Sequence, residues 1–166
     1  PTHYETELFA PVKNKILMLT TAELMSRETM PSASETQQHL FSEENIISGR
    51  IIADHIRAAV FILGDPMGVS PSNTDQGYIL RRLIRRAIRH GKKLGIQKHF
   101  TAELGEIFVD IYGEVYPELS KNRQRIIDEL KREEEKFQKT LEQGLREMRK
   151  IWKMDDPSQC HKEIAV

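Results

Sequence analysis

The sequence predicts an all-α protein: a helical bundle of about five helices that ends in a long C-terminal helix. Apolar residues recur every three or four positions in several separate stretches, which is the spacing of one face of an α-helix. Clusters of Gly, Pro, Ser and Asn separate these stretches and mark turns. At 166 residues and 19.3 kDa the chain has the size of one ordinary domain, so we expect residues 1–166 to share a single core.

The first helix is predicted over residues 5–19. Its apolar stripe consists of Leu8, Val12, Ile16 and Leu19. Pro11 lies early enough to be accommodated in the first turns. Residues 20–41 are expected to be linker-like, because from Ser26 onward they are rich in Ser, Thr, Gln and Glu and poor in apolar side chains.

A second helix is predicted over residues 42–63, with Ser42 as its N-cap and Asn45 where a capping box would have Glu or Gln. Asp54 and His55 are neighbours inside this helix. An acid beside a histidine could serve acid–base chemistry or bind a metal. No second His or Cys lies at ligand spacing, so a structural role is favoured for this pair.

The next helix, predicted over residues 74–95, has two distinct faces. Its apolar residues are Leu80, Leu83, Ile84, Ala87, Ile88 and Leu94, and its basic residues are Arg81, Arg82, Arg85, Arg86, Arg89, Lys92 and Lys93. Only Asp75 is acidic here, and like charges four residues apart each disfavour a helix by about 0.2–0.5 kcal/mol. We therefore expect an outside anion. A phosphate backbone fits, because the planar guanidinium binds phosphate through two parallel hydrogen bonds.

Two other interpretations of the basic face remain open. The chain could be a non-enzymatic DNA-binding helical protein with this helix in a major groove, although five arginines spread over half of the helix suit backbone binding better. Alternatively, it could be a structural helical bundle with an internally paired basic face. The candidate acids lie on the following segment: Glu103, Glu106, Asp110 and Glu114.

The C-terminal part of the chain is predicted to be helical as well. A short helix begins at Thr101, and beyond Pro117 a long charged helix covers residues 120–154. A helix of some thirty residues is about 45 Å long. The run Lys131–Lys136 is expected to be a solvated face, because its charges can pair at a spacing of four residues.

The charges are unevenly distributed although the formal net charge is zero: residues 74–99 carry eight Lys and Arg against one acid, which makes a positive patch.

The single cysteine, Cys160, excludes an intrachain disulfide and fits a reducing compartment. With His161 alone it is a poor metal site. No apolar run suits a membrane span or a secretory signal, so we expect a soluble, cytoplasmic protein. The start at Pro1 suggests a piece of a longer chain.

Three segments carry a family resemblance. The basic helix contains, in order, Asn73, Gly77-Tyr78, Arg81-Arg82, Arg85-Arg86-Ala87 and Arg89-His90-Gly91. About one helix upstream lies Ile52–Ala58, which includes Asp54-His55 and Arg57, and Tyr4–Phe9 precedes both. In this order the segments resemble the alanyl-tRNA synthetases, which are class II aminoacyl-tRNA synthetases, in the helical region that follows their catalytic motifs.

The resemblance implies that this chain is the tRNA-recognition (middle) domain, which binds the acceptor stem of tRNA(Ala) and adjoins a catalytic domain N-terminal to it. The full-length enzyme would activate alanine with ATP and Mg²⁺ and attach it to tRNA(Ala). The fragment alone would lack the aminoacylation site and be inactive, with no catalytic residue, cofactor or metal of its own.

The resemblance also implies roles for individual residues. Asn73 would read the G·U wobble pair of the acceptor stem, and the seven basic residues would bind its phosphates. Asp54, His55, Arg57, Gly77 and Tyr78 would pack and position the motif. On sequence alone the role of helix cap is favoured for Asn73, and the resemblance reverses this preference. Gln76 stands where many family members have Arg, which removes one charge at the start of the helix.

Overall fold

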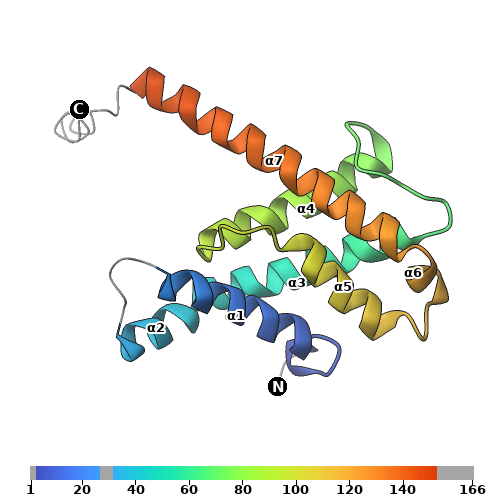
Figure 1. Ribbon diagram of the computed structural model, residues 1–166, viewed down its shortest axis with the longest axis horizontal. Helices are drawn as coiled ribbons and strands as arrows, with labels where there is room; N and C mark the ends of the chain where they lie inside the picture. Colours follow the sequence, from blue (N-terminus) through green and yellow to red (C-terminus); the bar gives the residue numbers. More distant parts are fainter. Residues whose placement is uncertain (1–2, 27–31, 153–166) are drawn as a thin grey trace. The chain divides into compact units, whose positions relative to one another are not determined.

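The computed structural model describes residues 3–26 and 32–152, and these form helices and loops without a strand (Figure 1). The all-α prediction is confirmed. The described residues form two compact units, one that ends at Glu134 and one that begins at Glu135. Within the described residues no helix is both long and apolar enough to cross a bilayer.

The expected number of about five helices is wrong, because the described residues form seven α-helices and one short 3-10 helix, η1 (His3–Glu5). The two unexpected helices are short. One is α2 (Ala33–Leu40). The other is α6 (Pro117–Lys121), whose C-cap Asn122 directly precedes the long helix α7 (Arg123–Trp152). The long helix thus begins three residues later than predicted, and residues 153–154 of the prediction lie outside the described residues.

The N-terminal helix α1 (Ala10–Met25) begins and ends about five residues later than expected. Pro11 explains the shift, because a residue without a backbone N–H is best placed in the first turn of a helix. Its buried residues are Val12, Ile16, Thr20 and Leu24.

The segment predicted to be linker-like is helical over residues 20–25 and 33–40. Helix α2 begins with a capping box: the Ser32 hydroxyl accepts from the Glu35 backbone N–H at 3.3 Å, and the Glu35 carboxylate accepts from the Ser32 N–H at 2.8 Å. Residues 27–31 of the expected linker lie outside the described residues.

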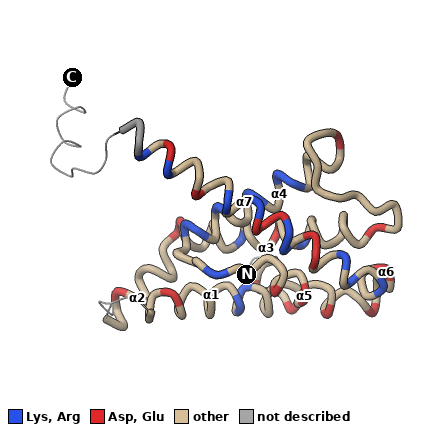
Figure 2. The backbone as a smooth tube through the Cα atoms, turned by 45° about the horizontal axis from the view of Figure 1, so that its top comes forward, with Lys and Arg blue, Asp and Glu red and all other residues tan. Residues whose placement is uncertain are grey.

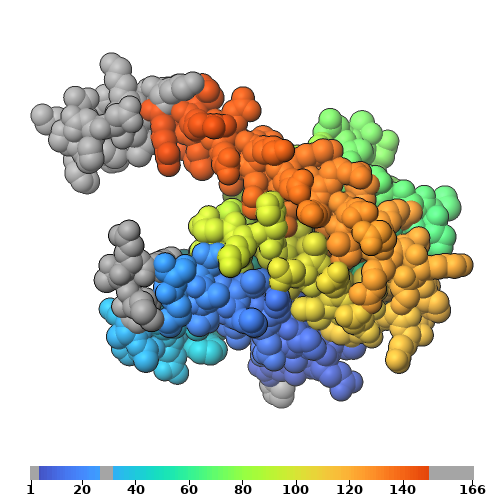
Figure 3. Space-filling model, viewed as in Figure 1, coloured from blue at the N-terminus to red at the C-terminus, as the bar shows by residue number. Residues whose placement is uncertain are grey.

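Helix α3 (Glu43–Gly64) is the centre of the first unit, since it contacts α1, α2, α4, α5 and α6. Ser42 is its N-cap, as predicted, and accepts from the Asn45 N–H. Ile52, Ile56, Val60 and Leu63 are fully buried. Helix α4 (Asp75–Lys93) packs along α3, while α5 (Thr101–Tyr112) lies against both α3 and α1. The adjoining blue and yellow atoms of Figure 3 show the contact between α1 and α5.

Close helix packing requires glycine where α4 meets the segment before α5. A Cβ added at Gly91 would collide with the ring of Phe100, which is itself buried. By contrast, a Cβ at Gly49 in α3 would have no heavy atom within 4 Å.

We predict opposite effects of alanine at these two helical glycines. Gly91→Ala should lower the free energy of unfolding by about 1–3 kcal/mol, because the Phe100 ring must move within a filled core. Gly49→Ala should raise it by about 0.5–1 kcal/mol, because alanine loses less backbone entropy in a helix. Urea denaturation followed by circular dichroism measures both, and equal stability of the two variants would contradict this account of the packing.

Candidate nucleic-acid interface

Helix α4 is amphipathic, as its sequence predicts. Its buried residues face the core of the first unit: Gly77, Leu80, Ile84, Ala87, Ile88 and Gly91. Figure 2 shows Lys and Arg in blue along the helix, and both blue and red segments along α7. The basic side chains of α4 are not equivalent, because they differ in exposure and in partners.

Four basic side chains form what we call the open basic row: Arg82, Arg86, Arg89 and Lys93. They follow one another at spacings of four, three and four residues, so they share one side of the helix. All four are exposed, and among the side chains that the structure describes none is in an ion pair with them. Arg82 lies over the ring of Tyr78, with its guanidinium carbon 5.6 Å from the ring centroid.

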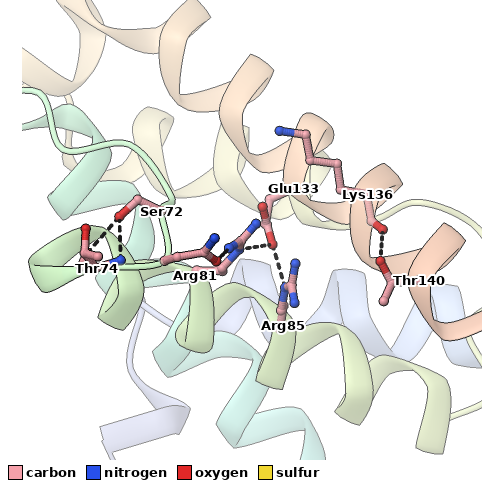
Figure 4. A network of polar contacts seen from close by, with 8 residues as sticks. Ser72, Thr74, Arg81, Arg85, Glu133, Lys136 and Thr140 are labelled. Atoms are coloured by element: carbon pink, nitrogen blue, oxygen red, sulfur yellow. Dashed lines mark hydrogen bonds and ion pairs between the residues drawn. The ribbon is translucent and has the colours of Figure 1, made fainter. Parts of the chain in front are cut away.

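Two arginines of the helix bind a buried carboxylate instead (Figure 4). The Nε atoms of Arg81 and Arg85 donate to the same oxygen, Oε1 of Glu133 on α7, at 3.2 and 2.6 Å. Glu133 is 3% exposed, while the side chains of Arg81 and Arg85 are 21% and 29% exposed. The interpretation as an internally paired face is therefore correct for these two arginines.

The acidic partner is not the one that the sequence suggested. Glu133 lies in the run Lys131–Lys136, which we expected to be solvated, whereas two of the acids of α5 pair with other cations. Glu103 pairs with Lys15 at 2.7 Å, and Asp110 pairs with Arg123.

The neighbouring residue Glu134 is fully buried and caps α5. Its carboxylate accepts from the backbone N–H groups of Phe100 and Thr101 at 3.3 and 3.1 Å, and from the Thr101 hydroxyl at 2.7 Å. Burial raises the pKa of this carboxyl, and the hydrogen bonds from Thr101 and Phe100 oppose that rise. Because Glu134 fixes this part of α7 to α5, it also fixes the backbone that carries Glu133.

Sequence reasoning missed Glu133 and Glu134, although a signal was present. Ile126 and Leu130 on α7 are buried, and positions 133 and 134 follow Leu130 by three and four residues. The two acids therefore continue the apolar stripe of the helix. A charged residue at a stripe position predicts a buried, paired charge better than it predicts a solvated face.

Asn73 does not cap α4. The N-cap position is Thr74, whose side chain makes no capping hydrogen bond, and the Ser72 hydroxyl accepts from the Thr74 N–H at 3.2 Å. The Asn73 side chain is exposed, and its Oδ1 accepts a hydrogen bond from Nη1 of Arg81. The amide therefore belongs to the same hydrogen-bonded chain as Glu133.

Gly77 allows the loop before α4 to fold back over the first turn. The Ser72 N–H donates to the Gly77 carbonyl at 3.0 Å, and a Cβ at position 77 would collide with the Ser72 hydroxyl and the Ser70 carbonyl. Next to it, Asp75 has φ of 50°, a left-handed conformation that Asp tolerates better than most residues. Tyr78 and Gln76 are exposed beside this loop.

Asp54 and Arg57 attach the N-terminal segment to α3. Asp54 accepts a hydrogen bond from the Tyr4 hydroxyl, which raises the pKa of Tyr4. Arg57 lies over the Phe9 ring at 4.9 Å and pairs with Asp54 at 3.9 Å. These are packing contacts, so the segments Tyr4–Phe9 and Ile52–Ala58 hold each other in place.

His55 and His90 lie near the open basic row. His90 Nδ1 is 3.1 Å from the hydroxyl of the buried Ser48. Burial lowers the pKa of both histidines below 6.5, and Arg86 lowers both further. Both side chains therefore favour the neutral form in the folded protein.

Comparison with known proteins identifies similar chains. A family model described as tRNA synthetases class II (A) matches residues 1–165. The alanine–tRNA ligase of Borrelia garinii subsp. bavariensis is 45% identical over 148 residues, which are 89% of this chain and 22% of that protein. That of Borreliella afzelii is 58% identical over 102 residues, 61% of this chain and 17% of that protein. That of Treponema pallidum is 43% identical over 141 residues, 85% of this chain and 21% of that protein. The chain therefore spans about a fifth of the length of these relatives.

The lowered pKa of His90 predicts how stability depends on pH. The unfolded chain binds a proton near pH 6.5, before the folded protein does, so the free energy of unfolding should fall as the pH is lowered below 6.5. His90→Gln can keep a hydrogen bond to Ser48 but does not titrate, and it should make this fall shallower. Urea denaturation between pH 7.5 and 5.5 measures the slope, and identical slopes for the two proteins would contradict the assignment.

Proposed function

The chain belongs to the family of class II tRNA synthetases, and we propose that it binds the acceptor stem of tRNA(Ala) as part of an alanine–tRNA ligase. The observation that carries the proposal is the open basic row, whose four exposed cations have no ion-pair partner among the described side chains of the helix that begins just after the exposed Asn73. The matched alanine–tRNA ligases support the choice of amino acid.

The proposal places this stretch after the catalytic motifs of the complete enzyme, where the segment Tyr4–Phe9 would lead away from a catalytic domain. The complete cytoplasmic enzyme would use ATP and Mg²⁺ to activate alanine. Among the residues that the structure describes, no group of three or more His, Cys, Asp or Glu side chains could hold a metal ion.

In this proposal the open basic row binds phosphates. Its three arginines and one lysine have no carboxylate partner among the described side chains, and their mutual repulsion would be relieved by a polyanion. Lys92 contributes less, because its ammonium donates to the backbone and side-chain oxygens of Gln97 at 3.2 Å. Phosphate contacts of this kind orient the RNA but carry no sequence information.

Base reading is assigned to Asn73. The wide, shallow minor groove of A-form RNA exposes base edges, so a short side chain at the end of the basic helix can reach them. The Asn73 amide is exposed, and its oxygen is held by Arg81, which leaves both hydrogens of its nitrogen available for the RNA. An alternative role of Asn73 as the helix cap has no support in the capping geometry.

The phosphate role predicts the effect of salt. Arg86→Ala should weaken binding to an acceptor-stem hairpin by about 1–3 kcal/mol of binding free energy. It should also reduce the slope of log K against log salt concentration by the contribution of about one phosphate contact. Arg85→Ala should reduce the slope less, because its guanidinium already pairs with Glu133. Arg123→Ala is the control, since it removes one charge that pairs with Asp110 outside α4. Filter binding at several salt concentrations measures the slopes, and an unchanged slope for Arg86→Ala would refute the role.

The base-reading role predicts how binding depends on the wobble pair of the hairpin. Asn73→Ala should reduce the preference for a hairpin with G·U over one with G·C at the recognition pair by about 1–3 kcal/mol, because a base contact is lost. Affinity for the G·C hairpin should change little. A variant that keeps the full preference would show that Asn73 does not read the base pair, and duplex DNA that competes as well as the hairpin would favour a DNA-binding protein.

A further inference from the structure

Asn73 lies in a loop, and an exposed side chain there would ordinarily sample several rotamers. Ordering such a side chain when a ligand binds costs about 0.5–1.5 kcal/mol, and a base edge is read only if the amide lies in the correct plane. A group that holds the amide in the free protein would therefore act on recognition without touching the RNA.

Arg81 is such a group. Its side chain lies on the second turn of α4, and Nη1 donates to Asn73 Oδ1 while Nε donates to Glu133 Oε1 at 3.2 Å. The guanidinium is planar, so a hydrogen bond at Nε sets the direction of the bond from Nη1. Figure 4 shows Arg81 between the loop at Ser72–Thr74 and Glu133.

The other end of this chain of contacts is fixed in the core. Glu133 is buried, it also accepts from Arg85 at 2.6 Å, and its neighbour Glu134 is bound to the first turn of α5. Rotation of Arg81 away from Asn73 would also break its hydrogen bond to Glu133. The buried carboxylate would then lose part of the positive charge that compensates it, which costs free energy. The orientation of the Asn73 amide is thus tied to the packing of α4, α5 and α7.

We propose that Arg81 is a positioning residue for base recognition: anchored by the buried Glu133, it holds the Asn73 amide with its NH₂ group directed at the RNA. The inference rests on the proposed function, in which Asn73 reads the recognition pair. It reassigns Arg81, which the sequence placed among the phosphate-binding residues. Arg85 pairs with the same carboxylate but has no hydrogen bond to Asn73 among the described contacts, so it is a natural control.

The test compares Arg81→Lys with Arg85→Lys in the full 166-residue chain. Both changes keep the positive charge, but lysine lacks the fork that joins Glu133 to Asn73. Binding is measured for two acceptor-stem hairpins that differ only in G·U or G·C at the recognition pair, with the unmodified chain and Asn73→Ala alongside. We expect Arg81→Lys and Asn73→Ala each to lower the G·U preference, by about 5- to 100-fold for a good contact. Arg85→Lys should keep the preference within about twofold, and the double variant Asn73→Ala with Arg81→Lys should lose no more than Asn73→Ala alone.

The outcomes separate the two proposals. If Asn73→Ala keeps the G·U preference, the base-reading function fails, whatever Arg81→Lys does. If Asn73→Ala loses the preference while Arg81→Lys keeps it, the positioning role alone is overturned. Equal losses in Arg81→Lys and Arg85→Lys would also overturn it, because the effect would then come from Glu133 and not from the contact with Asn73. Thermal unfolding of each variant establishes that the compared proteins are folded.

Discussion

The interaction on which the site depends is the burial of the Glu133 carboxylate against two guanidinium groups of α4. A buried carboxylate is costly unless its charge is compensated and its oxygens accept hydrogen bonds. Arg81 and Arg85, one turn of helix apart, compensate the charge, and both donate hydrogen bonds to Oε1 of Glu133. Loss of the carboxylate would leave two partly buried cations of like charge side by side. The pairing therefore fixes the register between α4 and the first turns of α7 more narrowly than apolar contacts alone, which tolerate small shifts.

This pairing divides one basic helix into two surfaces. Neighbouring positions of a helix point about 100° apart, so Arg81 and Arg85 turn toward α7 while Arg82 and Arg86 turn away from it. One pair is compensated within the chain and the other keeps its charge for solvent or a ligand. A count of charges along the sequence treats all seven cations alike, whereas the folded helix presents an excess that is concentrated in the open basic row.

Local sequence patterns predicted what local interactions determine. The helical class, the Ser42 cap, the amphipathic character of α4 and the membership of the synthetase family all followed from spacing and motifs within short segments. The capping box of Ser32 and Glu35 is also visible in the sequence, but the polar composition around it led us to predict a linker in place of α2. The pairing of Glu133 with arginines 48 and 52 positions away could not be predicted, because no local pattern encodes which helices meet. For the same reason the sequence could offer two roles for Asn73 and not the contact with Arg81.

The proposed roles of the arginines lower the general affinity for RNA and raise the discrimination between acceptor stems. Each arginine directed at a phosphate would strengthen binding to every RNA stem equally, so it would add nothing to the choice of one stem over another. An arginine that instead holds the amide of Asn73 gives up that general affinity. In return, the amide is already ordered before the RNA binds, so binding does not cost that entropy. Because the amide cannot turn to follow a displaced base edge, a wrong base pair loses the hydrogen bond. Discrimination of a wobble pair from a Watson–Crick pair depends on small displacements of base edges, and a side chain fixed from the core is better suited to detect them than a mobile one.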